Sequence, residues 1–205
     1  MFTGIVQGVG RVLHTQRDGE RVRLRICLPE NARQPIAVGA SVSIAGVCLT
    51  FVEGTPEDAA FDVIDETLRL TTLGALQTGA SVNVERAAAF GDEIGGHLLS
   101  GHVGGCASIV HRDAGDTHFS LRMRPPPALV PYIFSKGYIG VEGCSLTIGE
   151  DVESDGTFGV HLIPETLRVT TLGGLEVGDS VNLEVDAMTR AVVDTVKRVL
   201  ADRSG

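Results

Sequence analysis

The three side chains best suited to covalent or acid–base chemistry in this sequence are Cys48, His102 and Ser145. A thiol or a hydroxyl adds to an electron-poor carbon once its proton has been removed. An imidazole titrates near neutral pH and can accept that proton. Each residue also has an ordinary interpretation: a small buried hydrophobe, a surface imidazole, and a hydroxyl that satisfies the backbone. Chemistry is favoured by where the three residues fall in the sequence.

The sequence contains two similar copies. Residues 66–85 and 165–184 are identical at 14 of 20 positions, at a constant offset of 99. Two further pairs of segments match at an offset of 97: residues 46–50 with 143–147, and residues 3–6 with 100–103. A period near 100 residues is the size of a domain, so we infer a tandem duplication.

The two copies differ at positions that carry chemistry. Alignment of the copies pairs Cys48 with Ser145, Ile5 with His102, Asp62 with His161, and Gly39 with Lys136. We therefore expect one pocket in which the Cys48 thiol lies beside Ile5. Its twin is expected to hold the Ser145 hydroxyl near His102 and Lys136, although a lysine before a glycine is also common in solvated turns. Such an asymmetry suits one small molecule held in two chemical roles.

Alternation of apolar and polar residues predicts short antiparallel strands in both copies. Residues 21–28 place four apolar side chains on one face, which is typical of a strand with one buried side. Further strands are predicted at residues 3–13, 41–52, 60–64 and 81–86, and in the second copy at 101–110, 118–123, 137–150, 157–163 and 180–185. We predict an all-β fold in which each copy closes into a small barrel, because closure removes exposed sheet edges.

Helices are few in this prediction. Residues 31–36 and 128–135 can each form a short helix, and the TTLG segments a helical turn. A longer helix at residues 188–202 places five apolar side chains on one stripe: Val192, Val193, Val196, Val199 and Leu200. The first copy ends in no equivalent of this helix. The stripe must be buried either on the chain's own barrel or on another subunit.

The composition is that of an ordinary globular protein: 205 residues, 43% hydrophobic and 21% charged. No apolar run approaches the roughly 20 residues that span a bilayer, so no membrane association is expected. The opening residues have a duplicate downstream, so we expect no cleaved signal peptide. A net charge of −9 argues against a groove that follows nucleic-acid phosphates.

The four cysteines lie at positions 27, 48, 106 and 144 and form no CxxC pair. We therefore predict free thiols in a reducing compartment, with a cytoplasmic location. His97 and His102 are five residues apart and lack an acidic third ligand nearby, so no metal site is predicted.

Seven segments together carry a family resemblance: residues 1–6, 46–50, 84–87, 92–97, 100–103, 143–147 and 161–166. They look like the alpha-type riboflavin synthase family, and the resemblance covers nearly the whole chain. It implies two six-stranded Greek-key barrels at residues 1–97 and 98–187 and a trimerisation helix at 188–205. It also implies a reaction without metal or redox cofactor, the last step of riboflavin biosynthesis. In that step two molecules of 6,7-dimethyl-8-ribityllumazine exchange a four-carbon unit, which yields riboflavin and 5-amino-6-(D-ribitylamino)uracil.

The resemblance also assigns site residues position by position. The residues linked with activity are Phe2, Ser41, Cys48, His102, Ser145, Thr147 and Asp186. Ligand contacts assigned to the first barrel are Gly4, Ile5, Val6, Cys48, Leu49, Thr50, Asp62, Val63, Ile64, Asp65, Glu66 and Thr67. Those assigned to the second are Gly101, His102, Val103, Lys136, Ser145, Leu146, Thr147, Ile163, Pro164, Glu165, Thr166, Leu167 and Arg168. The active site is expected between the first barrel of one chain and the second barrel of its neighbour in a homotrimer.

The roles within this site are only partly assigned. His102 is the expected base or proton relay at neutral pH. The adding nucleophile is left open among Cys48, Ser145, Thr147 and a bound water. Asp186 is expected to hold the ribityl hydroxyls or to orient a neighbour. An association with lumazine synthase is also left open.

Three positions depart from the family pattern or vary within it. Ala45 stands where the family commonly has asparagine, which removes a donor and an acceptor expected near the first pocket. Glu142 stands where the family commonly has aspartate, and Asp65 adds a negative charge near the expected ligand rim.

Two other functions are compatible with a small duplicated barrel. One is a non-catalytic relative that binds a single chromophore as an optical antenna, which would need neither Cys48 nor His102. The other is a small barrel that binds an oligonucleotide or a partner protein. The net charge of −9 and the 4% aromatic content argue against a surface on which nucleic-acid bases stack.

Overall fold

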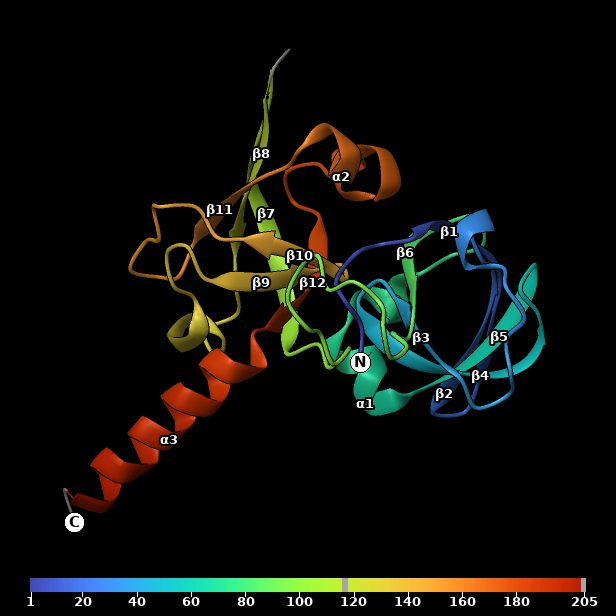
Figure 1. The fold of residues 1–205 in the computed structure, drawn as a ribbon, viewed down its shortest axis with the longest axis horizontal. Helices are drawn as coiled ribbons and strands as arrows, with labels where there is room; N and C mark the ends of the chain where they lie inside the picture. Colours follow the sequence, from blue (N-terminus) through green and yellow to red (C-terminus); the bar gives the residue numbers. More distant parts are fainter. Residues whose placement is uncertain (116–117, 204–205) are drawn as a thin grey trace.

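The computed structural model describes residues 1–115 and 118–203 and consists of two barrels followed by one long helix (Figure 1). The first barrel is closed. Its antiparallel strands are β1 (Gly8–Asp18), β2 (Arg21–Cys27), β3 (Ser41–Ile44), β4 (Val47–Thr55), β5 (Asp58–Ile64) and β6 (Ser81–Arg86). They pair in the order β1-β2-β5-β4-β3-β6, which is a Greek-key arrangement.

The second barrel repeats this topology with one open seam. Its strands are β7 (Gly105–Ala114), β8 (Phe119–Arg124), β9 (Tyr138–Val141), β10 (Cys144–Thr147), β11 (Phe158–His161) and β12 (Ser180–Val185). The order β10-β9-β12-β7-β8-β11 leaves β10 and β11 at the seam, where the Gly149 N–H donates to the Gly159 carbonyl at 2.7 Å. The predicted all-β fold of tandem six-stranded barrels with a C-terminal helix is confirmed, with the second barrel nearly closed.

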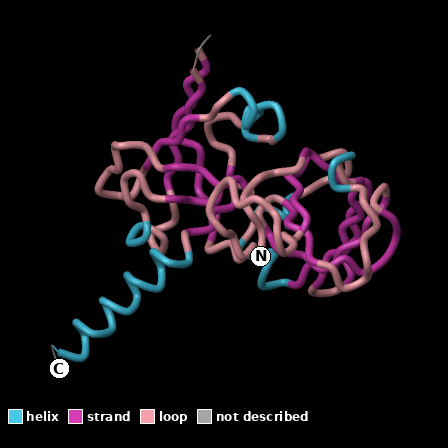
Figure 2. Tube along the Cα trace, viewed as in Figure 1, coloured by secondary structure: helices cyan, strands magenta, loops and turns pink. Residues whose placement is uncertain are grey.

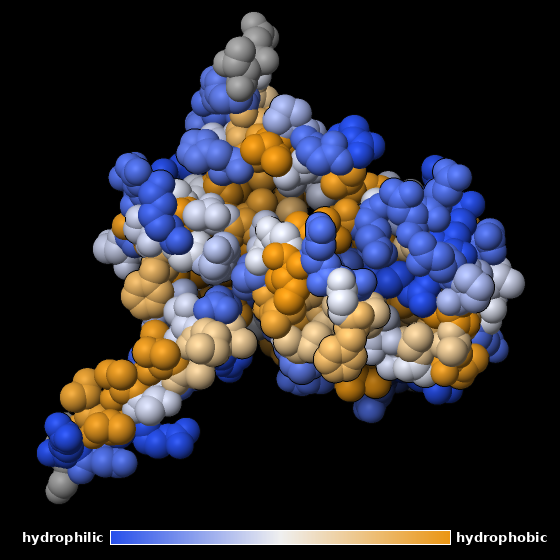
Figure 3. All heavy atoms as spheres, in the orientation of Figure 1, coloured by the Kyte–Doolittle hydropathy of each residue, from blue (hydrophilic) through white to orange (hydrophobic). Residues whose placement is uncertain are grey.

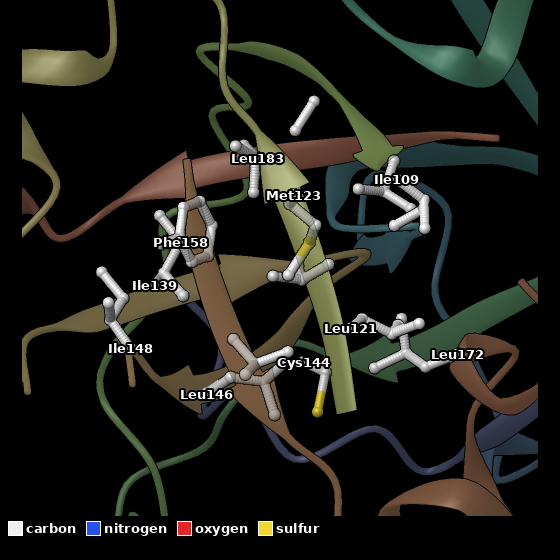
Figure 4. Packing of buried hydrophobic residues seen from close by; sticks show 14 of the residues in the cluster. Ile109, Leu121, Met123, Ile139, Cys144, Leu146, Ile148, Phe158, Leu172 and Leu183 are labelled. Carbon is white, nitrogen blue, oxygen red and sulfur yellow. The ribbon is translucent and has the colours of Figure 1, made fainter. Parts of the chain in front are cut away.

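Alternating side chains fill each barrel. In β2, Leu24 and Ile26 are fully buried, and Arg23 and Arg25, which alternate with them, are only partly buried. The second core packs Met123, Phe158 and Leu183 from three different strands (Figure 4). Burying a side chain of this size contributes about 1.5–3 kcal/mol, so the two cores hold the strands that carry the site.

The strands predicted at residues 41–52 and 137–150 are β-hairpins. Each turns on two residues with positive φ: Ala45 (49°) and Gly46 (82°) in the first, Glu142 (49°) and Gly143 (78°) in the second. Two consecutive positive φ values are what a tight two-residue hairpin requires. Ala45 and Glu142 stand before the turn glycines in place of the usual asparagine or aspartate, which is why each hairpin was predicted as one strand.

β1 and β7 begin later than predicted, because the residues before them form two arms. The N-terminal arm is residues 2–6, and the central arm is residues 99–103. The arms meet where Phe2 pairs with Leu99, and the Phe2 N–H donates to the Leu99 carbonyl at 2.8 Å.

Beyond this meeting point each arm crosses to the barrel of the other copy. The Ser145 N–H donates to the carbonyl of Gly4 at 2.8 Å, so the N-terminal arm lies against β10. The Cys48 N–H donates to the carbonyl of Gly101 at 2.9 Å, so the central arm lies against β4. Each candidate nucleophile therefore lies beside the arm that belongs to the other copy.

The two hairpin turns meet at the contact between the barrels. A Cβ added to Gly46 would lie 2.6 Å from the nitrogen of Gly143, so the two backbones touch at this point. Ala45 is buried here and packs in the first core. The Ala45 departure therefore lies at the contact between the barrels and not in a ligand pocket.

Two equivalent asparagines hold this contact. The Asn83 side-chain amide donates to the Glu142 carbonyl at 2.9 Å, and the Asn182 amide donates to the Ala45 carbonyl at 2.8 Å. Asn83 also accepts the Thr171 N–H at 2.7 Å. The reciprocal pattern gives the contact an approximate twofold symmetry.

The short helices lie at equivalent points of the two copies. α1 (Asp65–Leu70) follows β5, and α2 (Pro164–Val169) follows β11. Each leads into a 3₁₀ turn, η2 (Thr72–Ala75) or η4 (Leu172–Gly174). The helices predicted at residues 31–36 and 128–135 are single 3₁₀ turns, η1 (Glu30–Ala32) and η3 (Val130–Tyr132).

The long helix α3 (Ala187–Arg203) extends away from both barrels (Figures 1 and 2). Asp186 caps its start, since its carboxylate accepts the N–H and the hydroxyl of Thr189 at 2.8 and 2.7 Å. The Tyr132 hydroxyl of η3 donates to Asp194 at 2.5 Å, which ties the first half of α3 to the second barrel.

The predicted apolar stripe of α3 is exposed in the single chain. Val192, Val196 and Val199 are 60%, 51% and 45% exposed, and Figure 3 shows apolar side chains along this face of the helix. These valines are thus not buried on the chain's own barrel, which was one of the two alternatives. Residues 204–205 of the predicted 188–205 segment lie outside the described residues.

Candidate active site

A hollow of about 390 Å³ opens beside the seam of the second barrel. Its lining residues are Lys136, Ser145, Leu146, Thr147, Ile148, Gly149, His161, Ile163 and Thr166. We call it the Ser145 pocket. Its size suits a small molecule, and its lining mixes apolar walls with a few polar groups. The structure thus brings together the predicted contacts from β10, from the junction of β11 with α2, and from Lys136.

The charged group of this pocket is Lys136. Its backbone adopts a positive φ of 61°, and its ammonium pairs with the Glu150 carboxylate at 3.1 Å. Both side chains are mostly exposed, so this ion pair is weak and can be exchanged for a ligand. Lys136 is therefore a solvated turn residue that also lines the pocket.

Ser145 is held by His97, for which the sequence predicts neither a metal site nor a place in the pocket. The Ser145 hydroxyl oxygen accepts the main-chain N–H of His97 at 3.0 Å. The same oxygen lies 2.6 Å from Nδ1 of the His97 ring. The paired glycines that precede His97, Gly95 and Gly96, were the sequence signal for this close approach.

The thiol next to Ser145 is chemically inert. Cys144 points into the second core, and burial raises its pKa to about 12 (Figure 4). A thiol with such a pKa carries almost no thiolate at neutral pH. The groups of β10 that can react in the pocket are therefore the hydroxyls of Ser145 and Thr147.

The first barrel carries the counterpart, which we call the Cys48 site. Cys48 and Thr50 lie on β4, which pairs with β5. The central arm passes beside them, with His102 exposed and Val103 packed against the first core. Thr67 lies half-buried in α1, next along the chain. The site thus joins a half-buried thiol to an exposed imidazole.

The prediction of which residues lie beside Cys48 and Ser145 is wrong. Cys48 was expected beside Ile5, and Ser145 near His102. Because the arms cross, Cys48 lies beside the arm that carries His102, whereas Ser145 lies beside the arm that carries Ile5. The contacts assigned at residues 4–6 move to the second barrel and those at 101–103 to the first, and Val6 is buried in the second core.

Asp62 lies at the rim of the Cys48 site in a bidentate ion pair. Arg23 donates through Nε and Nη2 to the two oxygens of Asp62 at 2.7 and 2.9 Å. The hydrogen-bonded Arg23 guanidinium holds the pKa of Asp62 below its usual range. Asp62 is therefore a fixed anion and not a proton acceptor.

A shallow hollow of about 640 Å³ borders this rim. It is lined by Ile64, Asp65 and Glu66, together with Asp18, Glu20 and Arg21. Glu66 pairs with Arg69. Its equivalent Glu165 pairs with Arg168 at 2.8 Å, and Pro164 begins α2.

Several predicted residues lie outside both linings. Phe2 is only 1% exposed and holds the two arms together. Ser41 is half-buried at the start of β3, opposite Thr50. Leu49 and Val63 are buried in the first core, and Leu167 packs against the second. Asp186, the cap of α3, likewise lies outside both linings.

The two sites of one chain lie apart. The Cys48 site adjoins α1 and the Ser145 pocket adjoins α2, and Figure 1 shows α2 above the middle of the view and α1 below it. Among the described residues no cluster of three or more His, Cys, Asp or Glu side chains is placed to hold a metal ion. No described helix is long and apolar enough to cross a membrane.

Comparison with known proteins gives two kinds of match. The lumazine binding domain family matches this chain twice, at residues 3–87 and 100–186. Riboflavin synthase of Escherichia coli (strain K12) is 45% identical over 204 residues, which cover 99% of this chain and 95% of that protein. Riboflavin synthase of Chlamydia pneumoniae is 45% identical over 201 residues, which cover 98% of each chain.

Solved structures show the same architecture. The crystal structure of LumP complexed with riboflavin is 29% identical, with a TM-score of 0.83, and the match covers 91% of this chain and 100% of that one. The structure of LumP complexed with 6,7-dimethyl-8-(1'-D-ribityl) lumazine is 27% identical, with a TM-score of 0.81 and coverage of 91% and 99%.

Proposed function

The chain belongs to the riboflavin synthase family, and from that premise we propose how its two sites divide the reaction. Two molecules of 6,7-dimethyl-8-ribityllumazine exchange a four-carbon unit and yield riboflavin and 5-amino-6-(D-ribitylamino)uracil. One lumazine occupies the Cys48 site and the other the Ser145 pocket. The observation that carries this division is the duplicated lumazine-binding domain, in which equivalent strands offer a thiol and a hydroxyl.

The chemistry needs a base, a nucleophile and alignment. The 7-methyl group of a lumazine is acidic, because the carbanion left by deprotonation is delocalised into the electron-poor ring. His102 is exposed next to Gly101, whose carbonyl accepts the Cys48 N–H, and we expect it to be the base that takes this proton. Holding two reactants in register contributes about 7–11 kcal/mol, and for a reaction between two identical substrates we expect this contribution to dominate.

The two ligands meet only if two chains associate. We propose a homotrimer in which the Cys48 site of one subunit faces the Ser145 pocket of the next. The exposed valines of α3 support this arrangement, because an apolar helix face without cover favours association. The units of this assembly are then the barrels of residues 1–97 and 98–187 and the trimerisation helix of residues 188–205. We expect the protein to be cytoplasmic. Whether the trimer also associates with lumazine synthase is left open.

The experiment is direct. Purified protein is mixed with 6,7-dimethyl-8-ribityllumazine, and the products are separated by chromatography. Riboflavin and the pyrimidine in equal amounts support the proposal. Unchanged lumazine that remains bound and fluorescent would support the antenna alternative, which the likeness to ligand-bound LumP brings into consideration.

A further inference from the structure

Two buried glutamates lie at equivalent points of the two copies, outside both site linings. Glu85 is on β6 and Glu184 is on β12, and the duplicated segments 66–85 and 165–184 both end on this residue. The two residues are 3% and 6% exposed. A carboxylate buried to this degree is costly unless hydrogen bonds replace its lost water, so its partners indicate what it does.

The hydrogen-bond partners of Glu85 lie in the N-terminal arm. Its Oε1 accepts the main-chain N–H and the hydroxyl of Thr3 at 2.6 and 2.8 Å, and its Oε2 accepts the N–H of Gly4 at 3.1 Å. The Thr3 hydroxyl oxygen in turn accepts the N–H of Ile5 at 3.2 Å. Burial raises the pKa of Glu85, and the bonds from Thr3 and Gly4 oppose this effect in part. One side chain thus fixes the backbone of residues 3–5.

Glu184 holds the central arm in the same way. Its Oε1 accepts both the N–H and the hydroxyl of Ser100 at 2.6 Å, and its Oε2 accepts the N–H of Gly101 at 2.9 Å. The Ser100 hydroxyl oxygen accepts the N–H of His102 at 3.2 Å. We call each set of bonds an arm clamp. The central clamp therefore acts directly on the backbone of the expected base.

Each clamp belongs to one barrel, but the arm that it holds lies against the other. The carbonyl of Gly4 accepts the Ser145 N–H at 2.8 Å, and that of Gly101 accepts the Cys48 N–H at 2.9 Å. A Cβ added to Gly4 would lie 2.5 Å from Cβ of Ser145, and one added to Gly101 would lie 2.5 Å from Cβ of Cys48. With contacts this close, the clamp of one barrel sets the position of the arm at the site of the other.

We propose that Glu184 and Glu85 are positioning residues whose effects cross between the barrels. Glu184, in the second barrel, holds the central arm and its His102 at the Cys48 site. Glu85, in the first barrel, holds the N-terminal arm at the Ser145 pocket. This inference rests on the proposed function, because it assigns each carboxylate to one of the two lumazine sites.

Amide exchange measures the hold on each arm without turnover. A Glu→Gln change keeps the shape of the side chain but turns an NH₂ group toward at least one N–H of the arm, so that two donors face each other. In protein labelled with ¹⁵N-cysteine and ¹⁵N-serine, the two reporter signals are those lost in Cys48→Ala and Ser145→Ala. These N–H groups bond the arms, so each exchanges with solvent faster when its arm is released.

Glu184→Gln should speed exchange of the Cys48 amide by at least about tenfold and leave the Ser145 amide within about threefold of wild type. Glu85→Gln should do the reverse. Glu176→Gln, a mostly exposed glutamate of the second copy, is the control that should change neither. Equal acceleration of both amides would show that the carboxylates stabilise only the fold as a whole. That result, no acceleration, or acceleration only at the site of the variant's own barrel would overturn the inference, whether or not the wild-type protein forms riboflavin.

Milder variants give the same test if loss of a buried carboxylate prevents folding. Ser100→Ala and Thr3→Val each remove one of the three hydrogen bonds to a glutamate and keep the carboxylate. Ser100→Ala should speed exchange of the Cys48 amide more than that of the Ser145 amide, and Thr3→Val should do the reverse. The absence of this selectivity would contradict the inference.

Turnover tests whether the central clamp acts through the base. Glu184→Gln should lower kcat by at least about tenfold, because a misplacement of about 1 Å can cost about 100-fold. In a His102→Ala background, Glu184→Gln should lower kcat by less than about threefold further, since the arm no longer carries the imidazole. An unchanged kcat in the single variant, or independent losses that multiply in the double variant, would show that Glu184 does not position His102.

Discussion

Oε1 of the Glu142 carboxyl group accepts the main-chain N–H of Asn182 at 2.6 Å, inside the contact between the two barrels. The equivalent residue in the first copy is Ala45, so no carboxyl group occupies the position that the approximate twofold axis relates to Glu142. Burial raises the pKa of Glu142 to about 8. At neutral pH this side chain is therefore a neutral hydrogen-bonding group and not a charge.

The first prediction concerns the free energy of unfolding as a function of pH. Between its ordinary pKa of 4.5 and its folded value of about 8, Glu142 is ionised in the unfolded chain but protonated in the folded one. The free energy of unfolding should thus fall as pH rises through this window, by at most about 5 kcal/mol. Glu142→Gln should remove this decline, as measured by urea unfolding at pH 5 and pH 8. The surface variant Glu150→Gln should keep the wild-type dependence, and a Glu142→Gln protein that also keeps it would disprove the assignment.

His102→Ala should separate binding from chemistry. The His102 side chain is exposed on the central arm that lies against β4, so its loss leaves the cores intact. We expect turnover to fall by about 100-fold or more, with lumazine affinity changed by less than about threefold. Fluorescence titration gives the affinity, and riboflavin formation gives the rate. His111→Ala, on β7, is the control that should behave as wild type; unchanged turnover in His102→Ala would remove that residue from the mechanism.

Removal of residues 188–205 should give monomers with little activity. The cause is loss of the exposed valines of α3, without loss of either core. Sedimentation velocity measures the assembly, and Val192→Glu with Val196→Glu is a milder variant that keeps the helix. Arg198→Glu changes charge on the same helix outside the stripe and should leave the assembly unchanged. An active trimer formed by the truncated chain would show that α3 is not the assembly element.

Cys48→Ser tests whether the thiol takes part in the chemistry. If Ser145 is the nucleophile, Cys48→Ser should retain turnover within about tenfold, because a hydroxyl of similar size preserves the packing of Gly101 on β4. Loss of more than about 100-fold with unchanged lumazine binding would assign a chemical role to the thiol. Cys27→Ser, a half-buried thiol on β2, serves as the control.

Local pattern was enough to predict the barrels. The strands at residues 81–86 and 180–185 were predicted with their observed bounds, because regular alternation and flanking turn residues both act within a few positions. The hairpin turns at Ala45 and Glu142 were missed, since neither residue is a usual choice for positive φ. The error there is one of local conformation.

The pockets could not be predicted in the same way. Aligning the copies correctly paired Cys48 with Ser145 but assigned each arm to its own barrel. The hydrogen bonds of Gly4 and Gly101 to the opposite barrel are long-range contacts that no periodicity encodes. The contact between His97 and Ser145 was missed for the same reason, because the two residues are 48 positions apart in the chain.

The crossed arms have a consequence for how this protein arose. Backbone and amide contacts come in pairs that are related by the approximate twofold axis. Gly4 bonds Ser145 as Gly101 bonds Cys48, and Asn83 bonds one hairpin turn as Asn182 bonds the other. A single ancestral copy would offer the same surface twice and could close an isologous dimer with identical contacts. Once two copies are joined in one chain, each copy can acquire substitutions that the other lacks. Glu142, which has Ala45 as its equivalent, is such a substitution.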